Sequence, residues 1–132
     1  MDILIAEDEQ DVALTYMKSL QERGHNVTVT NDGQECLDVY NDKERRVDAN
    51  NDSSLTPFDA IILDHKMPKK NGFQVAKEIL SINPNQRIII ASAYDKDVFK
   101  EAAKYFQIHL EVLQKPFSID SLVGLVESSN KG

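Results

Sequence analysis

Three acidic residues of this chain stand directly after short apolar runs, at the points where strands would end. Glu7 and Asp8 follow the apolar residues 3–6, and Asp64 follows residues 60–63. Uninterrupted apolar runs with several isoleucines are typical of parallel strands that are covered on both faces. In open α/β sheets, ligands bind outside the carboxyl ends of the strands. The position of Asp64 therefore favours a role in chemistry over a role in packing.

Ser92 and Lys115 end two further apolar runs, at residues 87–92 and 110–114. Because the carboxyl ends of parallel strands meet at one edge of a sheet, we expect these two side chains to lie near the three carboxylates. Crowded carboxylates repel one another and take up protons unless a cation joins them. Oxygen ligands without histidine or thiolate favour magnesium over zinc. The sequence therefore predicts a Mg²⁺ site.

A magnesium ion held in this way leaves coordination positions for phosphate oxygens. Lys115 adds a positive charge at the same edge, and the hydroxyl of Ser92 can donate a hydrogen bond to a phosphoryl oxygen. A carboxylate in such surroundings can act as a nucleophile. The predicted site suits phosphoryl transfer onto Asp64.

The elements that must position these residues follow from the apolar spacing of the chain. Gly24 and Pro84 mark helix ends, and Ser118 is a good cap for a last helix. Residues 42–57 are almost free of apolar side chains and collect turn formers, so we expect a long, mobile loop there. Strands are expected at residues 3–6, 26–30, 60–63, 87–92 and 110–114, and helices near 10–23, 35–40, 73–83, 98–106 and 119–126.

This alternation of strands and helices predicts an α/β fold of the (βα)5 type, with one parallel sheet and helices on both faces. A length of 132 residues with 41% hydrophobic content is enough for one domain with its own core, so residues 1–132 are expected to form a single domain. The chain contains no basic leader and no apolar window of membrane-spanning length. We expect neither export nor membrane attachment.

The charge and cysteine content narrow the possible partners. With 22 acidic and 15 basic residues the net charge is −7, which argues against direct nucleic-acid binding and suits cations or a basic protein partner. Cys36 is the only cysteine, so one chain forms neither an internal disulfide nor a thiolate metal cluster. We expect Cys36 to be a small, buried or half-buried apolar residue in a cytoplasmic protein.

The motifs together resemble those of the response regulator receiver domains of two-component signalling, over essentially the whole chain. Each alone is weak, but they match the family in type, order and approximate spacing: Glu7-Asp8, Leu63-Asp64-x-x-Met67-Pro68-x-x-x-Gly72, Ser92-Ala93 and Lys115-Pro116-Phe117. The resemblance implies a flavodoxin-like, doubly wound (βα)5 sandwich. It also implies that Asp64 accepts a phosphoryl group from a histidine kinase or a phosphotransfer protein.

The same resemblance assigns roles to the other site residues. Ser92 and Lys115 contact the phosphoryl group, and a cis peptide bond before Pro116 aims the lysine into the site. The ligands of Mg²⁺ are Glu7, Asp8, Asp64 and the backbone carbonyl of Lys66. The family is a signalling domain rather than an enzyme, with self-phosphorylation from a donor and slow autodephosphorylation. It acts on a downstream protein target or on an output domain, as a monomer or a weak phosphorylation-dependent dimer.

The chain departs from the family pattern in three places. The segment 42–57 is longer than usual, Ile108-His109 replaces the glycine-alanine before the last strand, and Val112 replaces the aromatic residue that swings inward during switching. Because valine has no ring to swing, we expect the change on phosphorylation to stay in the loop after Ser92. We also expect the side chains of His65 and Lys66 to be exposed modulators beside the site.

Two other functions remain open. An aspartyl-nucleophile phosphohydrolase would share Asp64 and magnesium, but it usually has a second acid two residues later, where this chain has Lys66. A receiver-like docking module would never be phosphorylated, and the presence of every phosphorylation residue argues against it. Taken singly, Asp64 could be a turn carboxylate and Lys115 a surface charge. His25 and His109 are too scattered to be metal ligands and are expected to have surface or packing roles.

Overall fold

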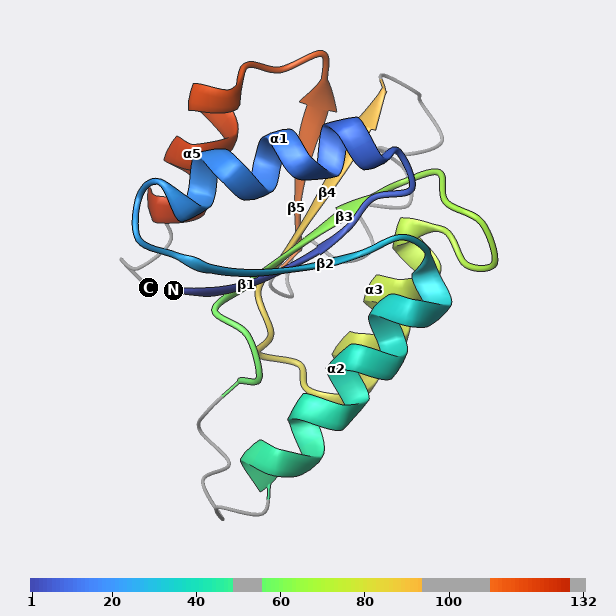
Figure 1. Cartoon of the computed structure of the whole chain (residues 1–132). Coiled ribbons are helices and arrows are strands. Elements are labelled where there is room, and N and C mark those ends of the chain that lie inside the picture. Colours follow the sequence, from blue (N-terminus) through green and yellow to red (C-terminus); the bar gives the residue numbers. More distant parts are fainter. Residues whose placement is uncertain (49–55, 94–109, 129–132) are drawn as a thin grey trace.

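The computed structural model of the chain describes residues 1–48, 56–93 and 110–128. Its strands form one sheet in the order β2-β1-β3-β4-β5, and all four neighbouring pairs are parallel (Figure 1). The predicted single parallel sheet is therefore confirmed, with strand bounds that differ from the expected ones by at most one residue. The strands are β1 (Asp2–Ala6), β2 (Asn26–Thr30), β3 (Ala60–Asp64), β4 (Ile88–Ala93) and β5 (Leu110–Lys115).

Helices cover both faces of this sheet, as the alternating sequence predicts. Helices α1 and α5 pack on one face, and α2 and α3 pack on the other (Figure 1). The helix expected near residues 98–106 lies outside the described residues. Among the helices that the structure describes, none is both long and apolar enough to cross a membrane. They are α1 (Gln10–Gln21), α2 (Gly33–Asp48), α3 (Gly72–Ile82) and α5 (Ile119–Glu127).

The central strands are apolar throughout because both of their faces are covered. In β1, Ile3 and Ile5 pack toward α1 and α5, whereas Leu4 and Ala6 pack toward α2 and α3. All five residues of β3 are buried, including Asp64 at its carboxyl end. Strand β3 thus ends with a buried carboxylate, which needs polar partners at the edge of the sheet.

The helix ends follow the signals in the sequence. Gly24, after α1, has a φ of +89°, a left-handed conformation that costs glycine little. Helix α3 ends at Asn83, directly before Pro84. The hydroxyl of Ser118 accepts a hydrogen bond from the backbone N–H of Ser121 at 3.0 Å and caps α5. The predicted stops and the predicted cap are confirmed.

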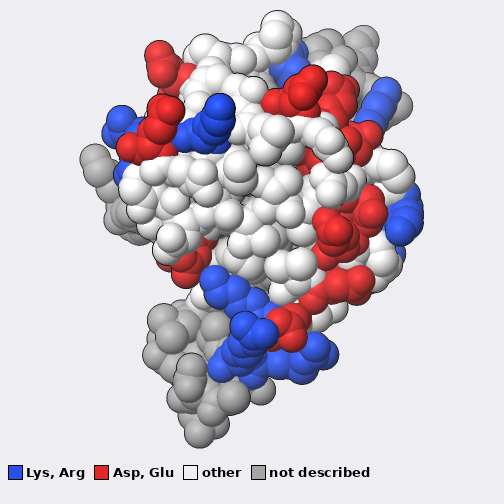
Figure 2. Space-filling view, viewed as in Figure 1, with Lys and Arg blue, Asp and Glu red and all other residues white. Residues whose placement is uncertain are grey.

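The expectation of a loop from residue 42 is wrong at its start, because α2 continues to Asp48. Asp42 lies 3.0 Å from Arg46 and 3.6 Å from Arg45, at the spacings that stabilise exposed helices. Figure 2 shows basic side chains gathered around this end of the helix, where they also complement the helix dipole. Residues 49–55 of the expected loop lie outside the described residues.

Candidate functional site

The carboxyl edge of the sheet holds the residues that the sequence analysis singled out. Asp64 and Lys115 are the last residues of β3 and β5, and Ser92 is the second-to-last residue of β4. A cavity of about 400 Å³ opens at this edge. Its walls are formed by Asp8, Glu9, Asp64, His65, Lys66, Ser92, Ala93 and Lys115. The topology brings together predicted site residues that are far apart in the sequence, from Glu7 to Lys115.

Three carboxylates form one cluster at this edge. One oxygen from each of Glu7, Asp8 and Asp64 lies within 4.8 Å of the other two. Glu7 is 2% exposed and Asp64 is 8% exposed, whereas Asp8 is exposed. Burial, with the nearby negative charge of Asp64, raises the pKa of Glu7 to about 8. Without a cation, the charged form of Glu7 is therefore unfavourable in this cluster.

This donor set fits a hard divalent cation. All three side chains offer carboxylate oxygens, which are the ligands that magnesium prefers, and one of them is open to solvent. A cation at the cluster would favour the charged form of Glu7, which burial and the nearby charge of Asp64 disfavour. Lys66 lines the cavity and its side chain is exposed, as expected. The residues present thus suit the predicted magnesium ion.

Lys115 supplies the positive charge of the site. Its Nζ atom donates a hydrogen bond to Oδ1 of Asp64 at 2.7 Å and lies 3.9 Å from Oε1 of Glu7. Burial alone would lower the pKa of Lys115, but the bond and the attraction to Asp64 outweigh it and raise that pKa. The Lys115–Pro116 peptide bond is cis, as the resemblance implies. The ammonium group is thus held against the carboxylate that ends β3.

The loop between β3 and α3 fixes the position of Asp64. The backbone N–H of Gly72 donates to the carbonyl of His65 at 2.8 Å. A Cβ atom at position 72 would lie only 2.7 Å from the carbonyl oxygen of Asp64, so glycine is required there. Asn71 and Gln74 form a reciprocal capping box that starts α3. The glycine of the sequence motif therefore lets the loop fold back closely on the site.

His65 differs from the expectation of an exposed modulator, because it is half-buried. Its ring meets the ring of Phe73 edge-on, with centroids 5.2 Å apart. Its Nδ1 atom lies 3.3 Å from Oγ of Ser92, which itself is only 4% exposed. The contact joins β3 to β4 across the site. No local sequence signal predicts it, since it depends on the side-chain rotamer of His65.

The other residues that the sequence analysis discussed lie away from the carboxylate cluster or outside the described residues. Cys36 is fully buried in the core below α2, as expected. His25 has a packing role, with Nε2 2.9 Å from Glu127. Val112 is half-buried and packs against the α2 and α3 layer. His109 lies outside the described residues. Glu9 was not assigned to the site from the sequence, but it lines the cavity.

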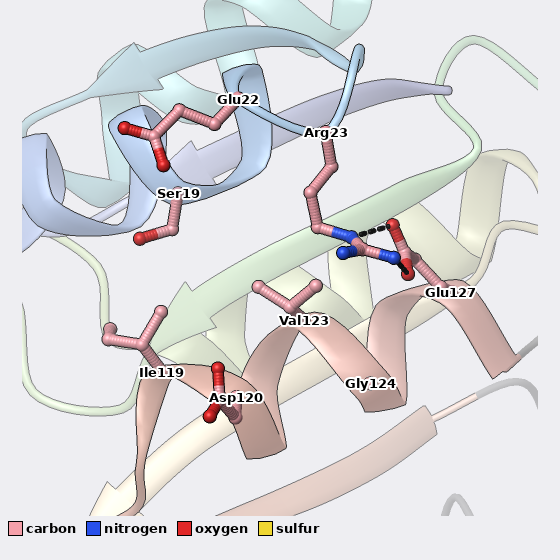
Figure 3. A pocket seen from close by; sticks show the side chains of 8 residues that line it. All are labelled: Ser19, Glu22, Arg23, Ile119, Asp120, Val123, Gly124 and Glu127. Atoms are coloured by element: carbon pink, nitrogen blue, oxygen red, sulfur yellow. Dashed lines mark hydrogen bonds and ion pairs between the residues drawn. The ribbon is translucent and has the colours of Figure 1, made fainter.

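A second groove, also of about 400 Å³, lies between α1 and α5 (Figure 3). Arg23 crosses it and donates to Glu127 at 2.6 Å. None of the described residues around this groove is a predicted site residue. Its lining consists of Ser19, Glu22, Arg23, Ile119, Asp120, Val123, Gly124 and Glu127.

The sequence and the fold of the chain are similar to those of known proteins. A family model described as the response regulator receiver domain matches residues 3–127. Response regulator RR06 of Streptococcus pneumoniae is 29% identical over 97% of the chain, which covers 52% of that protein. The response regulator receiver protein CpdR of Brucella abortus is 25% identical, with 95% of the chain and 92% of that protein covered.

Solved structures share the fold. The receiver domain of the Francisella response regulator 1452 is 29% identical, has a TM-score of 0.72 and covers 96% of the chain and 93% of its own. A receiver domain protein from Clostridium thermocellum is 23% identical and has a TM-score of 0.78. The match covers 96% of this chain and 91% of that protein's chain. The chain spans about half the length of several curated relatives. For example, it covers 54% of the transcriptional regulatory protein PdtaR of Mycobacterium tuberculosis.

Proposed function

Because the chain belongs to the family of response regulator receiver domains, we propose that it accepts a phosphoryl group on Asp64 from a histidine kinase or a phosphotransfer protein. The observation that carries this proposal is the double environment of Asp64. Its carboxylate belongs to the three-carboxylate cluster and also accepts a hydrogen bond from Lys115 at 2.7 Å. A nucleophilic carboxylate needs such charges to receive a phosphoryl group that is itself negative.

Glu7, Asp8 and Asp64, together with the backbone carbonyl of Lys66, would hold Mg²⁺. When bound, the ion supplies positive charge to the carboxylates and to the phosphoryl oxygens. The raised pKa of Glu7 supports this assignment, since burial and then the nearby charge of Asp64 disfavour the charged form of Glu7, which a bound cation would favour. Asp8 is the exposed member and faces the cavity through which a donor would approach.

In the transfer, an oxygen of Asp64 attacks the phosphorus atom of the donor. The bond from phosphorus to the donor nitrogen or oxygen breaks, and its electron pair leaves with the donor, which takes up a proton from solvent. Lys115 then pairs its ammonium with the new phosphoryl group, and Ser92 turns its hydroxyl toward a phosphoryl oxygen. The product is an aspartyl phosphate.

We assign the output to protein recognition in the cytoplasm. The net charge of −7 makes direct nucleic-acid binding unfavourable. The phosphorylated domain would act on a downstream protein or on an output domain, as a monomer or a weak phosphorylation-dependent dimer. Slow autodephosphorylation, rather than turnover of a substrate, would end the signal, since Lys66 stands where a phosphohydrolase would have its second acid.

Intact-mass analysis after incubation with Mg²⁺ and a small acyl phosphate tests this proposal. We expect the wild-type protein to gain one phosphoryl group and Asp64→Asn to gain none. Asp38→Asn, at an exposed position on α2, is the matched control and should behave as the wild type. Rapid release of phosphate without accumulation would favour a phosphohydrolase, and no gain in any variant would favour an unphosphorylated docking module.

A further inference from the structure

His65 is held beside the site by two backbone hydrogen bonds and by one contact of its imidazole ring. Its backbone N–H donates to the carbonyl of Ala91 at 2.9 Å, and its carbonyl accepts from Gly72 at 2.8 Å. The ring packs edge-on against Phe73 at an interplanar angle of 80°. Phe73 is itself only 3% exposed, so it forms a firm support. The ring therefore has little freedom to move away from β4.

The hydroxyl of Ser92 makes two hydrogen-bond contacts in this arrangement. Oγ lies 3.0 Å from the carbonyl oxygen of Ala93, to which it donates. Because a serine hydroxyl has a single hydrogen, the 3.3 Å contact with His65 is then satisfied by Nδ1–H donating to Oγ. The hydroxyl is thus engaged on two sides and does not donate toward Asp64.

We propose that His65 is a positioning residue that restrains the Ser92 hydroxyl in the unphosphorylated protein. This inference rests on the proposed function, in which Ser92 donates to a phosphoryl oxygen on Asp64. To do so the hydroxyl must release the carbonyl of Ala93, and its oxygen must give up Nδ1 of His65. His65 therefore favours the resting state, and phosphorylation has to overcome this restraint.

Two substitutions separate the hydrogen bond of His65 from the packing of its ring. Phenylalanine keeps an aromatic edge against Phe73 but has no donor for Ser92. Asparagine removes the ring but places an amide nitrogen close to the position of Nδ1. A role through Ser92 predicts that His65→Phe changes the behaviour of the site and His65→Asn does not, whereas a packing role predicts that His65→Phe is the milder change.

The affinity for beryllium trifluoride, a stable phosphoryl analogue, measures the restraint. Titrations in Mg²⁺ followed by NMR would compare wild type, His65→Phe and His65→Asn, each with Ser92 and with Ser92→Ala. Since one long hydrogen bond opposes binding, we expect His65→Phe to bind the analogue about threefold more tightly than wild type. His65→Asn should match wild type, and in the Ser92→Ala background both changes should have no effect. Equal affinities for all three proteins, or an effect that persists without the Ser92 hydroxyl, would overturn the inference.

A second measurement keeps the inference distinct from the proposed function. The ¹⁵N shift of the His65 Nδ1 atom reports its hydrogen bond in the free protein, without any phosphoryl analogue. We expect this shift to change in Ser92→Ala and not in Ser121→Ala, a serine at the start of α5. An unchanged shift refutes the contact. Failure of the wild type to bind the analogue would contradict the proposed function. Failure of the shift to change in Ser92→Ala would contradict the restraint on Ser92, whether or not the analogue binds.

Discussion

The groups around the Asp64 carboxylate interact with it mainly through their charges. It is 8% exposed at the end of an apolar strand, where an unpaired carboxylate would be costly. Lys115 compensates this charge at 2.7 Å, and burial together with the charge of Asp64 raises the pKa of Glu7. The site is thus poised between one lysine and two further carboxylates, an arrangement that an added cation or phosphoryl group would change.

Replacing Lys115 by alanine tests whether this lysine serves the phosphoryl group or the fold. We expect phosphorylation from a small donor to slow at least about tenfold, since a direct charge partner is lost. The free energy of unfolding should fall by only about 1 kcal/mol, because the lysine side chain is one-third exposed and its ion pair is partly solvated. Phosphorylation rates and urea unfolding measure both effects. Lys18→Ala, at an exposed position of α1, is the control, and a large loss of stability with normal phosphorylation would contradict the assignment.

The thiol of Cys36 should be unreactive in the folded protein. It is fully buried, and burial raises its pKa to about 12, so the nucleophilic thiolate is scarce at pH 8. We expect no alkylation by iodoacetamide under native conditions and complete alkylation in guanidinium chloride. Because Cys36 is the only cysteine, mass analysis reports this residue alone. Fast labelling of the native protein would show that the layer below α2 opens readily.

Single residues differ in how far their surroundings could be predicted. Asp64, Ser92 and Lys115 each end an apolar run, and the parallel topology then requires them to share one edge. The half-buried position of His65 could not be predicted in this way. It depends on the path of the loop to α3 and on a rotamer that reaches Phe73. Neither leaves a periodic pattern in the sequence.

At the scale of elements, α2 shows why apolar spacing sets a lower limit on helix length. Its last turns extend beyond the edge of the sheet (Figure 1), so they need no apolar stripe toward a core. The contacts of Asp42 with Arg45 and Arg46 support the helix there instead. Strands β1, β3 and β4 and helix α3, whose residues are mostly buried, were predicted more closely because burial produces the periodicity itself.

The end of α5 is held by the side chain of Arg87, directly before β4, which gives a prediction for stability. Arg87 is 13% exposed and donates to the carbonyls of Leu125 and Val126 at 2.7 and 2.8 Å. It also pairs with Glu111 at 2.8 Å. We expect Arg87→Met to lower the free energy of unfolding by about 2 to 3 kcal/mol, measured by urea titration, because charged hydrogen bonds to a helix end are lost.

Two further variants define this effect. Arg87→Lys should recover part of the loss, since an ammonium cannot reproduce the planar fork of the guanidinium. Glu111→Gln should cost about 0.5 kcal/mol, since the glutamate is 41% exposed. If Glu111→Gln is as damaging as Arg87→Met, the ion pair and not the helix end is the stabilising contact.

At the scale of the whole molecule, Glu127 links three elements and makes stability depend on pH. It accepts from Arg23 at 2.6 Å, after α1, and lies 2.9 Å from His25, before β2. Hydrogen bonds from Arg23 and His25 lower the pKa of Glu127 to about 2. Because the folded pKa lies below the ordinary value of 4.5, this stabilisation is present above about pH 4.5 and is lost as the pH falls toward 2.

Thermal unfolding of wild type and Glu127→Gln between pH 2 and 7 measures this linkage. We expect the wild type to be the more stable protein at pH 6, and the difference to shrink steadily below pH 4.5. A difference that stays constant across this range would mean that the charge of Glu127 contributes nothing. Asp120→Asn, an exposed position on α5, is the control.

The whole-molecule arrangement also decides what magnesium should do to stability. The three carboxylates come from the ends of two strands, β1 and β3, so the cluster exists only in the folded chain. A cation that binds only the folded state stabilises it, by about 1.4 kcal/mol when its concentration is ten times the dissociation constant. We therefore expect Mg²⁺ to raise the melting temperature of the wild-type protein.

Asp8→Ala should change this response in two opposite ways. Without magnesium, the variant should be at least as stable as the wild type, because one of three repelling carboxylates is gone. With magnesium, it should gain much less stability, because a direct anionic ligand is missing. Thermal melts with and without Mg²⁺ measure both effects, and Glu9→Gln, which lines the same cavity outside the cluster, is the matched control. Equal gains for wild type and Asp8→Ala would mean that magnesium does not bind at the edge where the strands end.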